Sequence, residues 1–523
     1  MSDSLGQNTT AASAKRKLSA SSSTGTPLSS PSIKQIPKKP KISGNTETTG
    51  SEEPILRFLP CERIRTARLI KNALDDNPGF PSFAYDIFAI REHENSFLDS
   101  FDTWDKEELN DVLNDDESGF KVLRSLSDDM ISHAENLRKI SDKCHTYVSG
   151  QQFSCPDRLE ITRPGCEYHW KDRHYPDLAR IFEHAAISGF GNVHTQETEF
   201  DPNVRNAREI PASEFSVDPK LIAEIEKCWG SFFLPANIRA VPYKIHLYGP
   251  GGQFRSHKDT PEKDLIGTFL YGLGDTTEPP DRFEIAGEHL SARYGSGVVF
   301  YTDVPHAVNA IEKGFRAVIA FKIFHREKTT KAVTKDSVCD KLKLAIRKSL
   351  VALKPPFAIG LRHEYHLDVK QHSSFDHMLV EVARSLPDVD VHVIPVFVQN
   401  SCATNADEPE ANRVWAMVYP LTETHLDFIL GDKLALERDP SIQWLKNLGG
   451  EIPLFRMGIY DLWSLQHTEG PGYTGNESRN WDQYSIYMHY AMVVVPKDGS
   501  VNVDTPSQDS VGVPDVCNPV SHD

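Results

Sequence analysis

The sequence predicts an α+β protein with a β-sandwich or jelly-roll core, flanking helices and a mixed α/β C-terminal region. Three observations lead to this fold class. Short apolar or alternating runs separated by Gly and Pro follow Pro242, and such runs indicate strands joined by turns. Before them, apolar residues recur at helical spacing. After residue 356, strand-like and helix-like patterns are mixed.

The N-terminal segment, residues 1–53, is rich in Ser, Thr, Lys and Pro and nearly lacks aromatic side chains. It cannot bury enough apolar surface to offset the entropy lost on folding, so we expect a disordered tail. Its basic clusters, Lys15-Arg16-Lys17 and Lys38-Lys39-Pro40-Lys41, fit either a nuclear localisation signal or a solvated basic tail. We therefore expect an intracellular protein, in the nucleus or the cytoplasm.

Regular elements can be placed in order along the rest of the chain. Residues 54–188 are expected to be mostly helical, because apolar residues recur at helical spacing from Ile64 to Leu74. Further predicted helices cover 177–186 and 219–229. Predicted strands cover 243–248, 253–259, 265–273, 282–285, 297–302 and 315–324.

The C-terminal region, residues 331–496, begins with a predicted helix over 337–353. Later segments predict a helix over 376–385 and strands over 391–398, 414–419 and 490–496. The region fits a degenerate second barrel, a substrate platform or a dimerisation domain, and the sequence does not choose among these. The polar end, residues 497–523, is expected to be a disordered tail.

Composition excludes several classes of protein. The 523-residue chain has a formal net charge of −17. Residues 1–50 contribute +5 and the remainder −22, so the folded body is a poor general phosphate binder and nucleic acid is not an expected partner. No apolar run is long enough to span a membrane, and the N-terminus lacks a secretory pattern. The eight cysteines form no C-x-x-C, which fits a reducing compartment.

The segment His257-Lys258-Asp259 supplies two side chains suited to metal binding. In a strand, residues i and i+2 share a face, so His257 and Asp259 can point at one ion. A second imidazole, His306, follows the predicted strand 297–302. Two His and one carboxylate on one side of a metal form a facial triad that leaves positions on Fe(II) open for a co-substrate and O₂.

A cation follows on the last predicted strand of the core. There, strand alternation places Arg316, Val318, Ala320 and Lys322 on one face. A guanidinium that faces into a barrel needs an anion, and the far end of a dicarboxylate would supply one in a bidentate pair.

The His-x-Asp spacing alone is weak evidence, since about one match is expected by chance in a chain of this composition. The chain has two others, His366-Leu367-Asp368 and His425-Leu426-Asp427. Neither follows a Gly-rich turn, and neither is followed by a Gly-x-Val-Val-Phe strand that leads to a distal His. We interpret both as structural.

Several longer motifs carry a family resemblance. They are Tyr248-Gly-Pro-Gly-Gly, His257-x-Asp259-Thr, Ile266-Gly-Thr-Phe-Leu, Phe300-Tyr-x-Asp303-x-x-His306 and Gly314-x-Arg316. With them the chain resembles the Fe(II)- and 2-oxoglutarate-dependent dioxygenases of the prolyl 4-hydroxylase-like branch. The segments Gly189-Phe-Gly-Asn, Asn203-Val-Arg205-Asn-Ala and Tyr473-Thr-Gly-Asn-Glu477 resemble large fungal members of that branch. The resemblance implies a double-stranded β-helix oxygenase domain over residues 189–330.

The resemblance also implies roles for individual residues. His257, Asp259 and His306 would hold the iron at the catalytic centre, and Arg316 would bind the distal carboxylate of 2-oxoglutarate. Relatives often carry a hydroxyl residue where this chain has Val318. A second hydrogen bond to 2-oxoglutarate would then come from elsewhere, for instance Thr268 or Tyr243, and Tyr248 matches a tyrosine at the active-site rim. The implied cofactors are Fe(II), 2-oxoglutarate as co-substrate and O₂, with ascorbate as a candidate addition.

The expected activity is hydroxylation of a C–H bond, coupled to oxidative decarboxylation of 2-oxoglutarate to succinate and CO₂. By resemblance the substrate is a protein side chain, with proline first. Two alternatives stay open at this point. One is a catalytically inactive double-stranded β-helix scaffold or interaction protein, and the other is the same chemistry on a nucleobase or small molecule. The sequence gives no oligomeric state and indicates no membrane association.

Overall fold

The computed structural model describes the following parts of the chain: residues 82–91, 120–153, 159–169, 175–192, 198–260, 262–326, 337–366, 371–403, 413–420, 452–458, 474–475 and 487–497, with short pieces between 424 and 448. All of them belong to one compact unit, residues 54–523. The disordered tails predicted for 1–53 and 497–523 and the helical spacing between Ile64 and Leu74 lie outside the described residues, apart from residue 497.

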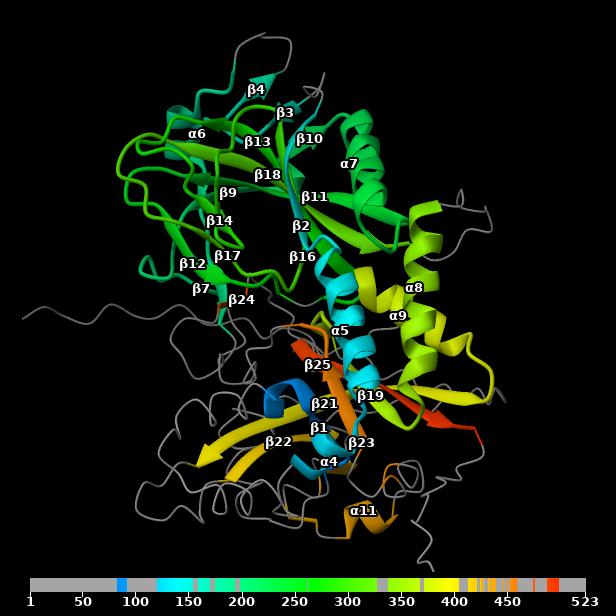
Figure 1. The fold of residues 1–523 in the computed structure, drawn as a ribbon. Helices are drawn as coiled ribbons and strands as arrows, with labels where there is room; N and C mark the ends of the chain where they lie inside the picture. Colours follow the sequence, from blue (N-terminus) through cyan, green and yellow to red (C-terminus); the bar gives the residue numbers. More distant parts are fainter. Residues whose placement is uncertain are drawn as a thin grey trace, which may run out of the picture. The chain divides into compact units, whose positions relative to one another are not determined.

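Two antiparallel sheets form the central domain. The order of strands in the first is β2 (Tyr147–Gln152), β16 (Ser296–Tyr301), β13 (Leu265–Asp275), β18 (Arg316–His325), β11 (Ile238–Tyr248), β9 (Arg208–Pro211) and β5 (Ala186–Ile187). The order in the second is β15 (Glu288–Leu290), β14 (Phe283–Ile285), β17 (His306–Val308), β12 (Gln253–His257) and β8 (Arg205–Asn206). Figure 1 shows the three long strands β11, β13 and β18 side by side.

The chain alternates between these sheets in the order of a double-stranded β-helix. From β11 to β18, strands β11, β13, β16 and β18 enter the first sheet, while β12, β14, β15 and β17 enter the second. The predicted fold class is therefore confirmed. The predicted strand segments match β11, β12, β13, β14, β16 and β18 to within a few residues at each end. The three-residue strand β17 was not predicted, because so short a segment shows no alternation.

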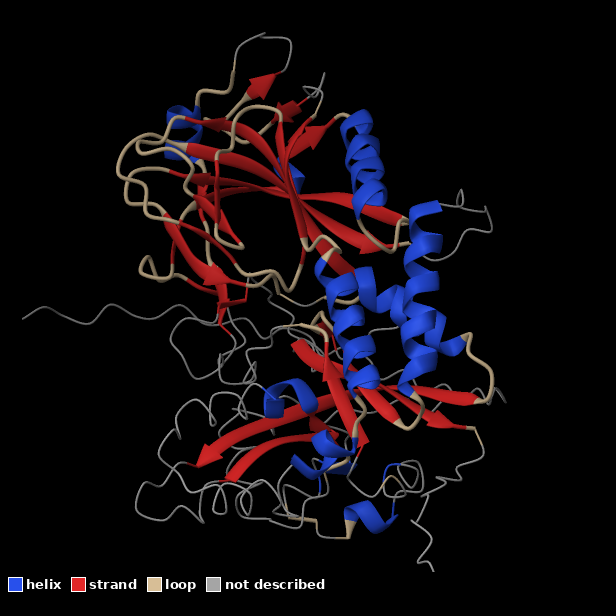
Figure 2. Cartoon of the chain, viewed as in Figure 1, coloured by secondary structure: helices blue, strands red, loops and turns tan. Residues whose placement is uncertain are grey.

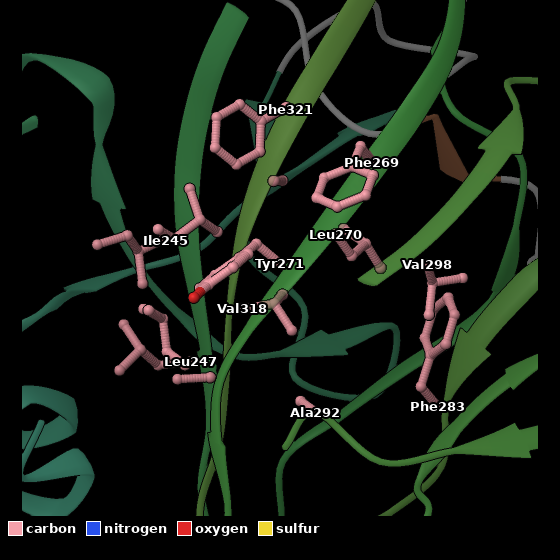
Figure 3. Packing of buried hydrophobic residues seen from close by; sticks show 14 of the residues in the cluster. Ile245, Leu247, Phe269, Leu270, Tyr271, Phe283, Ala292, Val298, Val318 and Phe321 are labelled. Atoms are coloured by element: carbon pink, nitrogen blue, oxygen red, sulfur yellow. The ribbon is translucent and has the colours of Figure 1, made fainter. Parts of the chain in front are cut away.

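Strand alternation divides the first sheet into two faces. Arg316, Val318 and Ala320 of β18 line a cavity between the sheets, as predicted. On the opposite face, Ile319 and Ile323 are fully buried in the apolar core. Figure 3 shows this packing, with Ile245 and Leu247 of β11 near Tyr271 of β13, and Phe269 and Phe321 close by.

Helix α7 (Pro219–Phe232) lies against this sheet (Figure 2). It begins at Asp218, whose carboxylate accepts a hydrogen bond from the Lys220 amide at 2.8 Å, with Pro219 in the first turn. Leu221, Ile225 and Trp229 recur every four residues and are buried. The predicted helix over 219–229 is confirmed.

The Trp229 indole fixes this helix against β13. A Cβ at Gly267 would come within 2.4 Å of the indole ring, so only glycine lets the two elements approach this closely. Trp229 also stacks on Phe233 and meets the Tyr301 ring edge to face.

A second barrel forms from residues far apart in the sequence. Its strands lie in the order β19 (Phe357–Gly360), β23 (Ile452–Arg456), β1 (Ala84–Asp86), β22 (Arg413–Pro420), β21 (Val389–Ala403) and β25 (Tyr487–Pro496). Strand β25 also pairs with β19, which closes a six-stranded barrel, and β23 is parallel to both of its neighbours. Strands β19, β21, β22, β23 and β25 of residues 331–496 therefore form this barrel together with β1, and the roles left open for the region stay predictions.

Helices α5 (Asp128–Asp142), α8 (Ser337–Leu353) and α9 (Ser374–Arg384) pack on one another and share an apolar core with the second barrel. The helices predicted over 337–353 and 376–385 are confirmed to within two residues at each end. The described part of 54–188 contains α4 (Phe120–Ser125) and α6 (Leu178–His184), and also strands β1 to β5.

Short strands form two small sheets, and strand β20 (Tyr365–His366) pairs with β25. One small sheet has the order β10 (Phe215–Val217), β3 (Leu159–Ile161) and β4 (Tyr168–His169), and another has the order β24 (Thr474–Gly475), β6 (Phe190–Asn192) and β7 (Thr198–Glu199). None of the helices in the described part of the chain is long and apolar enough to cross a membrane.

Gly314 lies in the turn before Arg316, and Gly287 is a comparison site elsewhere in the same domain. Together they test how tightly that turn is packed. Gly314 has φ +80° and Gly287 has φ +82°, so alanine is strained at both. A Cβ at Gly314 would lie 2.0 Å from the Thr276 carbonyl oxygen, whereas a Cβ at Gly287 would meet nothing within 4 Å. We expect Gly287→Ala to cost about 1–2 kcal/mol and Gly314→Ala at least ~2 kcal/mol more, measured by urea unfolding. Equal losses would show that the turn relaxes freely.

Candidate metal centre

His257, Asp259 and His306 converge in the central domain, as the spacing predicted. His257 ends β12 and His306 begins β17, and the two are register partners across the strand pair. Their ligand atoms and a carboxylate oxygen of Asp259 all lie within 4.8 Å of one another. All three side chains are buried. Among the described residues this is the one cluster of three or more His, Cys, Asp or Glu side chains placed to hold an ion.

Backbone carbonyls orient both imidazoles. Nδ1 of His257 lies 2.9 Å from the Arg255 carbonyl oxygen, and Nδ1 of His306 lies 3.0 Å from that of Val304. A carbonyl accepts only, so each Nδ1 carries the proton and each Nε2 presents its lone pair. Outer hydrogen bonds of this kind are typical of metal-binding histidines.

The Asp259 carboxylate is also held in place. Its Oδ2 accepts a hydrogen bond from the Thr268 hydroxyl at 2.5 Å, and its Oδ1 lies 3.9 Å from Nε2 of His306. The Asp259 amide donates to the Thr302 carbonyl oxygen at 3.0 Å, which links the two segments that carry the ligands. One oxygen is thus fixed by Thr268 while the other faces the two imidazoles.

The surroundings of His257 keep its ring neutral. Burial, followed by the nearby His306, lowers the pKa of His257 well below its usual value, although the bond to Arg255 acts in the opposite direction. Its ring stacks on Phe254 with centroids 3.6 Å apart. A neutral imidazole is the form that binds a metal ion, so the site is prepared for one.

The three residues line a cavity between the two sheets, with an empty volume of about 660 Å³ that includes its open mouth. Its apolar walls are Leu270, Phe283, Val308 and Val318. Apolar walls with a few convergent polar groups are typical of a small-molecule site.

Arg316 lies in the same cavity and is 3% exposed. Its Nε has no hydrogen-bond partner in the described part of the chain, and its guanidinium carbon lies 5.2 Å from the Phe283 ring centroid. Burial lowers the pKa of Arg316, although Asp275 and Tyr248 act in the opposite direction. A buried guanidinium without a bound anion is costly, so the arrangement favours an anionic ligand.

Asp275 faces Arg316 across the strand pair but bonds to other groups. Its Oδ1 accepts hydrogen bonds from the Thr277 amide and hydroxyl, and its Oδ2 accepts from Ser291 and the Ala292 amide. Although burial raises the pKa of Asp275, the bonds from Thr277 and Ala292 and the charge of Arg316 lower it overall. Asp275 therefore balances part of the Arg316 charge at a distance.

The remaining residues that the sequence proposed for the site are Tyr248, Thr268 and the two rival His-x-Asp matches. Tyr248 ends β11 opposite Arg316, is 3% exposed and lines the cavity. Thr268 also lines the cavity, but its hydroxyl proton is used by Asp259, so we assign Thr268 to orienting that carboxylate rather than to 2-oxoglutarate. Of the two rival matches, Asp368 lies outside the described residues. Among the residues that the structure describes, His425 and Asp427 belong to no such cluster.

Two residues that follow β19, His363 and Glu364, bond to the segments that carry the metal ligands. The sequence did not predict these contacts. Nδ1 of His363 lies 3.0 Å from Oδ2 of Asp303, three residues before His306. The Glu364 amide donates to the same oxygen at 3.1 Å. The Glu364 carboxylate binds Nζ of Lys258, between His257 and Asp259, at 2.7 Å. Two adjacent residues thus hold both segments that carry the triad.

Comparisons with known proteins gave matches among solved structures, while no family model and no curated protein matches. A Pseudomonas putida prolyl-4-hydroxylase is 17% identical with a TM-score of 0.24, over 38% of this chain and 99% of that one. A Trichoplax adhaerens prolyl hydroxylase in complex with a hypoxia-inducible factor peptide is 12% identical with a TM-score of 0.24, over 37% and 91%. A Burkholderia pseudomallei oxidoreductase of the 2OG-Fe(II) oxygenase family is 11% identical with a TM-score of 0.22, over 39% and 94%. At this distance, we base the function on the side chains described above.

The His363–Asp303 pair predicts a pH dependence of stability. Burial lowers the pKa of His363, but the nearby Asp303 and, less strongly, Asp376 outweigh it, so the pKa is raised overall. Burial raises the pKa of Asp303, but the charge and hydrogen bond of His363 outweigh this effect, so the pKa of Asp303 is lowered overall. The stabilisation of the folded state by the raised pKa of His363 is complete below about pH 6.5 and is lost as the pH rises through that pKa. The stabilisation by the lowered pKa of Asp303 is present above about pH 3.9 and is lost as the pH falls through that pKa.

We therefore expect the melting temperature to fall between pH 6 and pH 9. His363→Gln should cost about 1–3 kcal/mol at pH 6, because it removes the charged partner of the partly buried Asp303 carboxylate, and should flatten this fall. His289→Gln, at an exposed position, is the control. A His363→Gln variant that keeps the full pH dependence would contradict the assignment.

Proposed function

We propose that the protein is an Fe(II)- and 2-oxoglutarate-dependent dioxygenase that hydroxylates a C–H bond of a protein side chain. One observation carries the proposal. Two imidazole Nε2 atoms and a carboxylate oxygen converge in the same cavity as the buried Arg316 guanidinium, whose Nε has no hydrogen-bond partner among the described residues. This donor set fits Fe(II) with positions left open, and the guanidinium fits the far end of a dicarboxylate.

In this mechanism His257, Asp259 and His306 hold the iron. When bound, the iron supplies the oxidation that couples decarboxylation of 2-oxoglutarate to hydroxylation of the substrate. The chain contributes orientation. The carbonyls of Arg255 and Val304 hold the imidazoles with Nε2 facing the ion. Thr268 directs Asp259 so that one oxygen is available.

The same cavity selects and shields the co-substrate. Arg316 binds its distal carboxylate in a charge-assisted pair, and Tyr248 lies opposite on the neighbouring strand. Leu270, Phe283 and Val308 give the cavity apolar walls, which exclude water from the reacting groups. Proline is the first candidate for the substrate residue because of the motif resemblance.

The direct test is turnover. The purified full chain with Fe(II), O₂ and 2-oxoglutarate should form succinate, and a peptide library should yield a product heavier by one oxygen atom. Succinate without any hydroxylated peptide would support the oxidative chemistry and contradict a protein substrate. If the chain retained no metal and formed no succinate with any candidate, it would be an inactive scaffold.

Loss of one ligand should abolish metal retention. His257→Ala and Asp259→Ala are each expected to weaken Mn(II) or Fe(II) binding at least ~100-fold, because loss of an outer hydrogen bond alone costs about 10–100-fold. Anaerobic equilibrium dialysis measures this, and the exposed His289→Ala is the matched control. Unchanged binding in both ligand variants would show that His257 and Asp259 do not hold the metal ion.

Loss of the buried guanidinium should act on the co-substrate alone. Arg316→Ala is expected to raise the KM for 2-oxoglutarate about 10–100-fold, since it removes a charge-assisted hydrogen bond worth about 1.5–3 kcal/mol. Mn(II) binding should be unchanged. Arg293→Ala, on an exposed arginine, serves as control. An unaltered KM would show that Arg316 has another role.

A further inference from the structure

His246 is a buried side chain of the cavity to which the sequence assigned no role. It lies on β11 two residues before Tyr248, is 6% exposed and lines the same cavity as Arg316. Its register partner on β18 is Val318, the position at which the expected hydroxyl group is missing. Directly paired residues on one sheet face have Cβ atoms about 4.5–5.5 Å apart, so the imidazole lies beside the gap left by Val318.

The neighbouring Arg205 fixes the tautomer of this imidazole. Its Nη2 lies 2.9 Å from Nδ1 of His246. A guanidinium only donates, so Nδ1 must accept and the proton of the neutral ring must be on Nε2. Burial, together with the charges of Arg205, Lys244 and Arg316, lowers the pKa of His246 well below its usual value, which keeps the ring neutral.

Arg205 is itself held rigidly. Its Nη1 donates to the Gly189 carbonyl oxygen at 2.9 Å, and its guanidinium carbon lies 4.5 Å from the centroid of the Phe254 ring. Phe254 in turn stacks on His257. Arg205 is thus a positioning residue for His246, built into the wall that carries the first metal-ligand candidate.

The cavity leaves the His246 proton available for an anion. Nε2 of His246 has no hydrogen-bond partner among the described residues. Arg205, Arg316 and Lys322 line the cavity, whereas Asp259 is the one carboxylate among its lining residues. Of the hydroxyl donors first considered, Thr268 already donates its proton to Asp259.

We propose that His246 donates its Nε2 proton to the distal carboxylate of 2-oxoglutarate, beside Arg316, in place of the missing hydroxyl group. This inference rests on the proposed function, because it concerns the co-substrate of that site. Two neighbouring donors, one charged and one neutral, would then select 2-oxo acids that carry a second carboxylate.

The test compares two ligands and two variants by calorimetry on the full chain loaded with Mn(II). The ligands are 2-oxoglutarate and 2-oxovalerate, which has the same carbon chain without the distal carboxylate. In His246→Asn the amide oxygen still accepts from Arg205, but no donor reaches the Nε2 position. In His246→Gln the amide nitrogen restores a donor there.

We expect His246→Asn to weaken 2-oxoglutarate binding about 10–100-fold, as for loss of a hydrogen bond to a charged group. His246→Gln should recover most of the loss, and neither variant should change 2-oxovalerate binding. If His246→Asn bound 2-oxoglutarate as tightly as the unchanged chain, or lost affinity equally for both ligands, the proposal would be overturned. An unchanged chain that fails to bind 2-oxoglutarate would instead overturn the proposed function.

A spectroscopic measurement tests the role of Arg205 separately. With ¹⁵N-labelled histidine, and with His246 assigned by its loss in His246→Asn, the ring should show an unprotonated Nδ1 and a protonated Nε2. Arg205→Met should abolish this preference. A protonated Nδ1 in the unchanged chain would contradict the proposal, whatever the stability of the variants.

Discussion

The pairing of β12 with β17 is the constraint on which the site depends. It places His257 opposite His306, although 49 positions separate them in the sequence, and the amide of Asp259 bonds to Thr302 just before β17. The two strands belong to the second sheet, while Thr268 and Arg316 come from the first. The cavity therefore exists only because the chain alternates between two facing sheets.

Because the polar groups of the site are buried, each of them needs a specific hydrogen-bond partner or ligand. The imidazoles, the carboxylate and the guanidinium are each less than a tenth exposed. Backbone carbonyls and Thr268 satisfy the outward-facing atoms of the triad. The inward-facing atoms, with Nε of Arg316, stay available for a metal ion and a dianion. A double-stranded β-helix alone does not determine function, and these available atoms are what point to it.

The sequence predicted much of this arrangement because the relevant patterns are local. Alternation in β18 correctly placed Arg316 and Val318 on the cavity face, and His257 and Asp259 were paired by their spacing. The interactions that escaped prediction join distant residues. Arg205 and His246 are 41 positions apart, and Asp303 and His363 are 60 apart. No helical or strand periodicity in the sequence predicts contacts over such separations. Strand β1 likewise enters a barrel whose other strands follow hundreds of residues later.

Anomalous diffraction at the manganese edge, from crystals grown with Mn(II) and 2-oxoglutarate, would locate the metal ion and the co-substrate in the cavity. We expect one strong peak within bonding distance of Nε2 of His257, Nε2 of His306 and one oxygen of Asp259. We also expect the distal carboxylate of 2-oxoglutarate on Arg316. A peak elsewhere, no peak, or a ligand bound away from Arg316 would contradict this arrangement.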